Sequence, residues 1–328
     1  MAVDIESGQI NEMGIMSKNF AVIGAGGYIA PRHLRAIRDT GNRLLAAIDP
    51  KDSVGVLDQY SYDIRFFTEI ERFDRYLEKL RRGPEEERVH FVSVCSPNYL
   101  HDSHCRLALR VGADVICEKP LVINPWNLDA LEEIEAETKR RVYTILQLRV
   151  HPSLIQLRES LLTSKVIHEV EMTYITSRGP WYQVSWKGNH DKSGGVATNI
   201  GIHFFDLLMW LFGSVNGIKV YHADHEHMSG FIELERARVR WFLSVDRNDL
   251  PEQAKANNKT TYRSITVDGK EIEFSEGFTD LHTKVYEETL AGRGFGIKEA
   301  RPSVELTHKI RSAEISPLDT LAHPLLKK

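Results

Sequence analysis

The sequence predicts an α/β protein in two parts: a parallel sheet with crossover helices, then an α+β half with a large, open, mainly antiparallel sheet. From Lys18 to Gln147, short apolar runs alternate with amphipathic stretches, a pattern typical of strands buried on both faces and their connecting helices. A glycine-rich turn joins the first strand to the first helix. After Pro152, apolar and polar residues alternate instead, which indicates half-exposed strands.

The first half contains five predicted strands and four predicted helices. The strands are the short apolar runs Phe20–Gly24, Leu44–Asp49, His90–Cys95, Asp114–Glu118 and Val142–Leu146. The helices between them are the amphipathic stretches Arg32–Asp39, Ile70–Arg82, Asp102–Val111 and Pro125–Lys139. This alternation predicts a doubly wound parallel sheet.

The second half contains strands whose side chains alternate in polarity. They are His168–Thr176, Ala237–Val245 and Ile265–Ile272, the last with Asp268-Gly269 at a two-residue hairpin turn. Helices are predicted over Ile200–Phe212 and Leu281–Ala291, and Leu250–Thr261 is predicted to be a polar loop. Met172, Tyr174, Val239 and Trp241 should share an exposed apolar sheet face, and a homo-oligomer would bury that face.

Composition excludes several classes of protein. The 328 residues suggest about two domains, and a net charge of −4 with interleaved acidic and basic residues argues against nucleic-acid or anionic-membrane binding. The longest apolar run, Phe204–Phe212, is too short to span a bilayer. Three cysteines without metal-ligand spacing are typical of reduced thiols in a cytoplasmic enzyme. We expect an N-terminal extension over residues 1–17, a first domain over 18–147 and a second over 148–328.

The glycine-rich turn predicts a dinucleotide site. Two glycine registers are possible, and in the one we prefer, Gly24, Gly27 and Ala30 are all small. Such a turn lets backbone N–H groups approach a pyrophosphate at the positive end of a helix. Asp49 ends the second predicted strand, where a carboxylate accepts both hydroxyls of an adenosine ribose and repels a 2′-phosphate. The first half is therefore predicted to be a Rossmann domain that prefers NAD to NADP.

Two further motifs carry a family resemblance. Cys117-Glu118-Lys119-Pro120-Leu121 closes the fifth predicted strand, and a segment from Gly194 to Asp206 contains Thr198, Asn199 and His203. With the glycine turn, these motifs resemble the Gfo/Idh/MocA oxidoreductases. Finer features, among them the segments that begin at Gly27, Asp49, Ser96 and Arg178, resemble a branch that oxidises C3′ of UDP-N-acetylglucosaminuronic acid in bacterial lipopolysaccharide and O-antigen biosynthesis.

The resemblance implies an active site between the two halves, with Lys119 and His203 beside the nicotinamide. It implies NAD as cofactor, a nucleotide-sugar substrate, a homotetramer and, as in some members, 2-oxoglutarate that reoxidises the NADH. We predict cofactor contacts from Gly24, Gly26, Gly27, Tyr28, Ile29, Asp49, Ser53, Ser96, Pro97, Asn98, His101, Glu118, Lys119 and Gln147. We predict substrate contacts from Lys119, Arg149, Arg178, Lys187, Thr198, Asn199 and His203.

The residues suggest how oxidation of a secondary alcohol would be divided between side chains. An imidazole titrates near neutrality, so His203 is the predicted base. Lys119 is the predicted partner of the developing alkoxide, and it becomes the alternative base if its pKa is depressed. Much of the family has aspartate where this chain has Asn199, and an amide cannot accept the proton.

Other interpretations stay open at this point. The chain could be another sugar or polyol dehydrogenase of the same family, or a non-catalytic NAD-binding regulator. His222, His225 and His227 with Asp224 are metal-ligand residue types, but we predict a solvated turn and no metal site. Gly292–Gly296 follows a predicted helix and is interpreted as its C-cap and turn.

Overall fold

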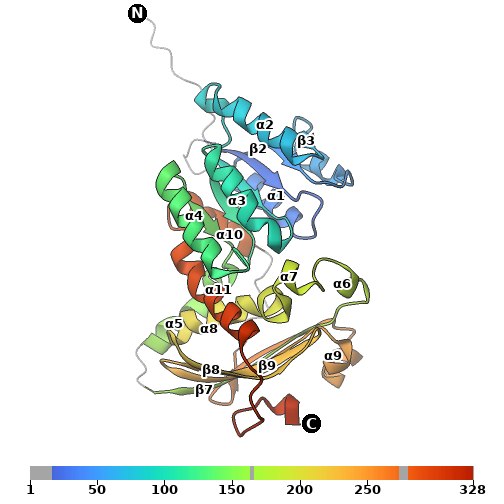
Figure 1. Ribbon diagram of the computed structural model, residues 1–328, viewed down its shortest axis with the longest axis vertical. Helices are drawn as coiled ribbons and strands as arrows, with labels where there is room; N and C mark the ends of the chain where they lie inside the picture. Colours follow the sequence, from blue (N-terminus) through green and yellow to red (C-terminus); the bar gives the residue numbers. More distant parts are fainter. Residues whose placement is uncertain (1–16, 163–165, 273–279, 328) are drawn as a thin grey trace, which may run out of the picture.

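The computed structural model describes residues 17–162, 166–272 and 280–327. Two six-stranded sheets lie toward opposite ends of the molecule, with helices between them (Figure 1). The predicted N-terminal extension lies outside the described residues except for Ser17.

The first sheet is parallel throughout and has the order β3-β2-β1-β4-β5-β6. Its strands are β1 (Asn19–Ile23), β2 (Arg43–Ile48), β3 (Arg65–Phe67), β4 (Phe91–Val94), β5 (Asp114–Cys117) and β6 (Val142–Thr144). The five predicted strands are confirmed, and the short β3 was missed because its three residues show no period. The strand order reverses beside β1, where ligands of open α/β sheets bind at the carboxyl ends of the strands.

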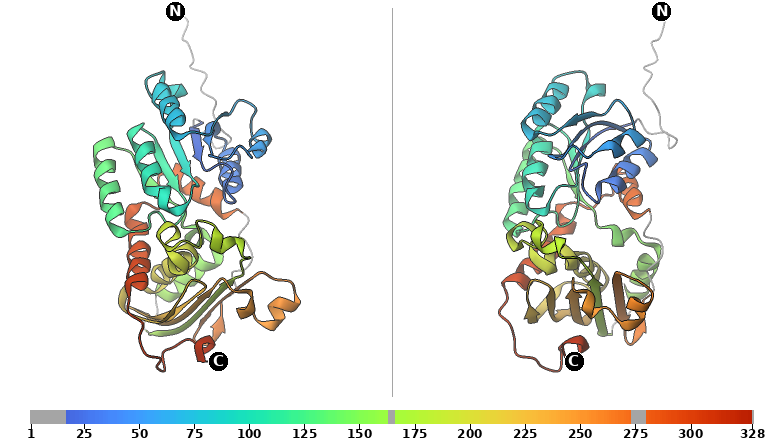
Figure 2. Two further views of the ribbon diagram at one scale, coloured as in Figure 1. Left: turned by 45° about the vertical axis from the view of Figure 1, so that its right-hand side comes forward. Right: turned by 90° about the vertical axis from the view of Figure 1, so that its right-hand side faces the viewer.

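Helices of the first half cover both faces of this sheet (Figure 2). They are α1 (Ala30–Asp39), α2 (Ile70–Arg81), α3 (His101–Arg110) and α4 (Pro125–Thr138), all close to their predicted bounds.

The chain returns to the first half through α10 (Leu281–Leu290) and the unpredicted α11 (Ile297–Ser312), which follows the predicted turn at Gly292–Gly296. Tyr286 of α10 is fully buried and stacks on Phe20 of β1. The predicted division of the chain at residue 147 stays a prediction, and this contact shows that α10 contributes to the core of the first half.

The second sheet has the order β12-β11-β7-β10-β9-β8, in which only the β7–β10 pair is parallel among the described strands. The strands are β7 (His168–Thr176), β8 (Val215–Ala223), β9 (His227–Leu234), β10 (Ala237–Ser244), β11 (Thr261–Val267) and β12 (Lys270–Glu271). Asp268 and Gly269 both have positive φ, 51° and 78°, which confirms the predicted hairpin turn. The sequence missed β8 and β9.

The face of this sheet that was predicted to be exposed is covered instead. Met172, Val239 and Trp241 are fully buried, and Tyr174 is partly buried, because helix α8 (Ile202–Phe212) packs on that face. The opposite face carries charged side chains such as Glu171 and Arg240, and the C-terminal segment contacts it through Asp319 and His323. The prediction of an exposed apolar face was therefore wrong, and it no longer supports an oligomer.

Shorter helices complete the described chain. They are α5 (Pro152–Leu162), α6 (Trp181–Val184), α7 (His190–Ser193) and α9 (Glu252–Ala256), with 3₁₀ turns at η1 (Gly55–Gln59), η2 (Glu85–Glu87), η3 (Asn98–Leu100), η4 (Gln147–Val150), η6 (Arg247–Asp249) and η7 (Pro324–Lys327). Helix α9 interrupts the segment Leu250–Thr261, which was predicted to be a loop.

One helical stretch of the described chain, His190–Phe212, is long and apolar enough to cross a membrane. Its most apolar window has a mean hydropathy of 1.3, and 78% of that window is buried inside the protein. Packing between the second sheet and α11 therefore accounts for its apolar character.

Candidate active site

The glycine turn has the geometry of a dinucleotide site. Gly24 has φ +88°, and a Cβ atom there would lie 2.8 Å from the backbone of Cys95. Helix α1 begins directly after the turn, and its N-cap residue, Ile29, supplies no capping side chain. Ala30 and Arg32 donate their N–H groups to the Gly27 and Ile29 oxygens, at 3.1 and 3.0 Å, and Pro31 has no N–H. The positive end of α1 still lies at the glycine turn, which fits the pyrophosphate of NAD. Tyr28, at the tip of the turn, is 87% exposed.

Asp49 lies against the same turn. Its Oδ2 accepts the Gly26 N–H at 3.0 Å and its Oδ1 accepts the Lys51 N–H at 2.9 Å. A Cβ atom at Gly26 would lie 3.2 Å from this carboxylate, so the close approach favours glycine. Each carboxylate oxygen keeps a further lone pair, so Asp49 is able to accept hydroxyl groups of a ribose.

Lys119 reaches from the end of β5 into the second half. Its Nζ donates to the backbone oxygen of Asn199 at 3.0 Å. Asn199 belongs to a π-helical turn, η5 (Ala197–Gly201), that leads into α8. Asn199 Nδ2 donates to the hydroxyl of Tyr182 at 2.8 Å, and Asn98 Nδ2 donates to Asn199 Oδ1 at 3.3 Å. This set of contacts joins the predicted cofactor side of the site to the predicted substrate side.

Lys119 is surrounded by more positive charge than negative charge. Burial lowers its pKa, and the charges of Lys187 and Arg178 lower it further, whereas the charge of Glu118 raises it. Lys187 lies with its Nζ 5.2 Å from the centre of the Trp181 ring, and Arg178 is exposed. Cations that repel one another in this way attract an anionic ligand.

His203 stands in the first turn of α8, partly buried. Its ring makes no hydrogen bond to the part of the chain that the structure describes. Burial lowers its pKa well below the ordinary value, and the nearby Lys119 ammonium adds to that effect. The imidazole is therefore neutral at neutral pH and able to accept a proton.

Thr198 is a second residue with incomplete hydrogen bonding. It is fully buried, and its Oγ1 has no hydrogen-bond partner among the described residues. A buried hydroxyl without a partner is costly to the stability of the protein.

The loop after β4 brings further predicted residues to this edge of the sheet. Asn98 also donates to the Ser193 oxygen at 2.9 Å, and Ser96 Oγ lies 2.8 Å from His104 Nδ1. The ring nitrogens of His101 lie 2.6 Å from the Pro120 oxygen and 2.8 Å from the Ser96 oxygen, so His101 fastens this loop to the segment that follows Lys119. The other predicted cofactor residues near strand ends are Ser53, which is exposed, and Pro97 and Gln147, which are partly buried.

Glu118 faces inward. Its Oε1 accepts from His33 Nε2 at 3.0 Å and from His282 Nε2 at 2.9 Å, and it is 7% exposed. The predicted contact of Glu118 with the nicotinamide ribose has little room in this arrangement. Neither His33 nor His282 was singled out from the sequence.

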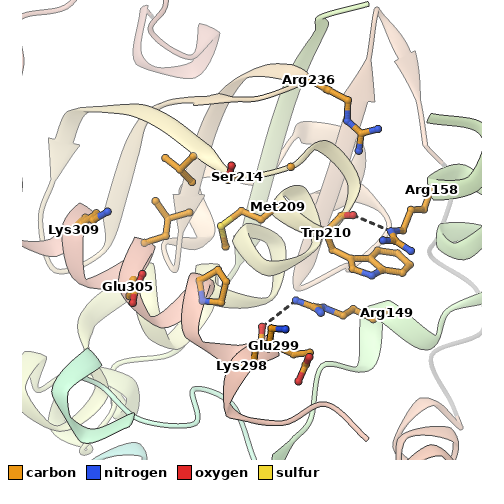
Figure 3. Close-up of a pocket in the computed structure, with 14 residues that line it drawn as sticks. Arg149, Arg158, Met209, Trp210, Ser214, Arg236, Lys298, Glu299, Glu305 and Lys309 are labelled. Atoms are coloured by element: carbon orange, nitrogen blue, oxygen red, sulfur yellow. Dashed lines mark hydrogen bonds between the residues drawn. The ribbon is translucent and has the colours of Figure 1, made fainter. Parts of the chain in front are cut away.

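Arg149 lies elsewhere, which argues against its predicted contact with substrate. Its guanidinium forms a two-point ion pair with Asp206, at 2.9 and 2.7 Å, and donates to the Glu299 oxygen at 3.2 Å. It lines a separate cavity of about 610 Å³ at the end of α8 opposite to His203, beside Trp210 and Arg158 (Figure 3). The guanidinium of Arg149 is therefore engaged in contacts that hold α8 against α11.

Three groups of metal-ligand residue types occur among the described residues. His33, Glu118 and His282 are buried and joined by the hydrogen bonds given above. His222, Asp224 and His227 lie together at the surface, and His227 also lies near Asp246 and Asp249. The expectation of no metal site stays a prediction.

Residues 18–146 match the model of the Gfo/Idh/MocA oxidoreductases with an NAD-binding Rossmann fold, and residues 164–239 match that of the family's C-terminal alpha/beta domain. The chain belongs to the Gfo/Idh/MocA oxidoreductase family. The predicted fold class is confirmed with it, and so are the predicted dependence on NAD and the two-domain type.

Two solved structures of one dehydrogenase are similar to the chain over nearly their whole length. One is the WlbA (WbpB) dehydrogenase from Thermus thermophilus in complex with NAD and alpha-ketoglutarate, which is 52% identical with a TM-score of 0.91. The other is the same dehydrogenase in complex with NAD and UDP-GlcNAcA, 51% identical with a TM-score of 0.90. Each match covers 94% of this chain and 99% of the other.

Curated family members match over shorter segments. Inositol 2-dehydrogenase of Rhizobium meliloti is 26% identical over 201 residues, which is 60% of this chain and 56% of that protein. D-glucoside 3-dehydrogenase of Escherichia coli is 33% identical over 129 residues, 37% of this chain and 35% of that protein. The chain thus spans about a third to just over half of these relatives.

Proposed function

We propose that this protein is a dehydrogenase that oxidises the C3′ hydroxyl of UDP-N-acetylglucosaminuronic acid to the 3-keto sugar nucleotide, with NAD as its cofactor. The observation that carries the proposal is the contact of Lys119 Nζ with the Asn199 oxygen of the second half, at 3.0 Å, with the charges of Lys187 and Arg178 close enough to lower the pKa of Lys119. A uronate carboxylate and a diphosphate supply the negative charge that such a site lacks. The similarity to a dehydrogenase solved with UDP-GlcNAcA supports the same substrate.

The chemistry divides between His203 and Lys119. Oxidation of a secondary alcohol removes a proton from oxygen and a hydride from carbon, and NAD, when bound, accepts the hydride. His203, neutral because its pKa is lowered, takes the hydroxyl proton. Lys119, held by the Asn199 oxygen, donates to the same sugar oxygen and stabilises the charge that develops there.

The remaining predicted residues bind and orient. Gly24, Gly26, Gly27 and the start of α1 would hold the pyrophosphate of NAD, and Asp49 would hold the adenosine ribose. Thr198 and Asn199 would face the sugar, and Arg178 and Lys187 would bind its carboxylate or diphosphate.

Turnover and assembly are parts of the same proposal. A similar dehydrogenase was solved with alpha-ketoglutarate, and reoxidation of NADH by 2-oxoglutarate would complete a cycle without release of the cofactor. We also propose a cytoplasmic homotetramer, on the family resemblance alone. Light scattering at micromolar concentration tests the assembly, and a monomer would contradict it.

The test is incubation of the purified protein with NAD and UDP-N-acetylglucosaminuronic acid, with and without 2-oxoglutarate, followed by mass spectrometry. We expect a product lighter by two hydrogens. UDP-N-acetylglucosamine, which lacks the carboxylate, is the matched control and should react poorly. If the protein oxidises inositol or a simple glucoside and not the nucleotide sugar, the proposed substrate is wrong. If it binds NAD but oxidises none of these compounds, the result favours a non-catalytic regulator.

A further inference from the structure

A chain of buried polar side chains leads from β4 to the residue before Lys119. Ser93 Oγ lies 2.6 Å from the hydroxyl of Tyr286, and that hydroxyl lies 2.7 Å from His33 Nδ1. His33 Nε2 and His282 Nε2 both contact Glu118 Oε1, at 3.0 and 2.9 Å. Glu118 Oε2 accepts the backbone N–H of Lys119 at 3.2 Å. These residues come from α1, β4, α10 and the end of β5, and all five are buried.

One arrangement of protons makes every contact in this chain a pairing of one donor with one acceptor. Ser93 donates to Tyr286, Tyr286 donates to Nδ1 of His33, and Nε2–H of His33 donates to Glu118. Nε2–H of His282 donates to the same carboxylate oxygen. Glu118 then receives three donors, which an ionised carboxylate accepts while both imidazoles remain neutral. The result is one net negative charge buried next to Lys119.

The electrostatic balance of Glu118 agrees with this arrangement. Burial by itself raises the pKa of Glu118, but the hydrogen bonds from His282 and His33 hold that pKa well below its usual range. Burial lowers the pKa of His33, which keeps its ring neutral. The titratable groups close enough for their charges to interact with that of Glu118 are His33, Cys95, His101, Cys117, Lys119, His203, His282 and Tyr286.

We propose that Glu118 is a positioning residue whose carboxylate, fixed by His33 and His282, keeps Lys119 protonated against the repulsion of Lys187 and Arg178. The inference deepens the proposed function, because it assigns Lys119 permanently to the role of hydrogen-bond donor and leaves the proton to His203. It assigns Glu118 a role other than the predicted ribose contact, for which three protein donors leave a single lone pair on Oε2.

The first experiment measures Lys119 without turnover. The cofactor-free protein is labelled with trace acetic anhydride at a series of pH values, and acetylation of Lys119 is followed by peptide mass spectrometry. In Glu118→Gln the midpoint for Lys119 should fall by about one pH unit, since the negative charge that raises the pKa of Lys119 has been removed. Glu135→Gln is the matched control, because Glu135 also accepts a backbone N–H in the first half, but its contacts are to Val142 and Arg141 and its charge is not among those that shift the pKa of Lys119. It should leave the midpoint unchanged.

The second experiment follows the pH dependence of kcat. With the negative charge gone, the pKa values of His203 and Lys119 both fall, so both limbs of the profile should move to lower pH in Glu118→Gln. An unmoved profile with a raised KM for NAD would overturn the inference in favour of the ribose contact. An unmoved labelling midpoint with a lower melting temperature would overturn it in favour of a purely structural role.

The inference and the proposed function fail separately. If the nucleotide sugar is not oxidised, the labelling of Lys119 still decides the role of Glu118. If Glu118→Gln does not fold, nitrogen NMR of the histidine rings in the wild-type protein decides it. His33 should be neutral with its proton on Nε2, and a proton on Nδ1 or a charged ring would refute the arrangement.

Discussion

The two sides of Lys119 differ in how completely their polar groups are paired. On the side of the first sheet, hydrogen bonds run from Ser93 through Tyr286 and His33 to Glu118, and His282 bonds to the same carboxylate. On the side of the second sheet, the Thr198 hydroxyl has no partner in the described chain and the nearby cations repel one another. Complete pairing stabilises the protein by itself, whereas incomplete pairing costs stability until a ligand arrives. This difference distinguishes residues that hold the side chains of the site in place from residues that bind the ligand.

The largest expected effect comes from the incomplete side. His203→Asn should lower kcat by roughly 10²–10⁴-fold, the usual contribution of a positioned base, with the affinity for NAD almost unchanged. In the wild type the rate should rise with pH, with an inflection below the ordinary histidine pKa of about 6.5, because the lowered pKa of His203 makes its ring neutral at a lower pH. Steady-state kinetics and calorimetry measure both effects. If the inflection persists in His203→Asn and disappears in Lys119→Met, the lysine is the base.

The complete side should respond in stability. Tyr286→Phe removes the donor to His33 Nδ1 and the acceptor of Ser93, so it should lower the free energy of unfolding by about 1–3 kcal/mol. Denaturant unfolding of the NAD-free protein measures the loss. An unchanged unfolding free energy would mean that the chain of hydrogen bonds is not formed.

Asp49 is an intermediate case, because its oxygens hold two backbone N–H groups and still have room for a ribose. NAD should bind more tightly than NADP, whose 2′-phosphate would meet the carboxylate, and Asp49→Ala should reduce that difference by about tenfold. Calorimetry with the two cofactors measures it. Equal binding of NAD and NADP by the wild type would refute the assignment.

The smallest effect should have the opposite sign from Tyr286→Phe. Thr198→Val replaces an unpaired buried hydroxyl by a methyl group of similar size, so the NAD-free protein should gain up to about 1 kcal/mol in its free energy of unfolding. The KM for the nucleotide sugar should rise in the same variant. A loss of stability would show that Thr198 is paired in solution, and the comparison of the two sides would no longer hold.

The sequence predicted the first sheet well because strands buried on both faces and a glycine turn leave strong local patterns. It also placed Lys119, Asn199 and His203 in one site through the family motifs. It could not reveal that Met172, Val239 and Trp241 face α8, because alternation separates two faces of a strand without stating which one is covered. The partners of Glu118 were equally hidden, since His33 and His282 are far apart in the chain and meet only when α10 returns to the first half.

The π-helical turn at Ala197–Gly201 contains one residue more than an α-helical turn. The directions in which Thr198 and Asn199 point, relative to His203, depend on that extra residue. An α-helix rotates by about 100° per residue, so deletion of Ile200 would restore an α-helical turn and rotate Thr198 and Asn199 away from the direction of His203. Every side chain of the site would still be present in such a variant. A related protein that lacks this extra residue would therefore carry the same amino acids in its sequence but present them on a different side of the helix.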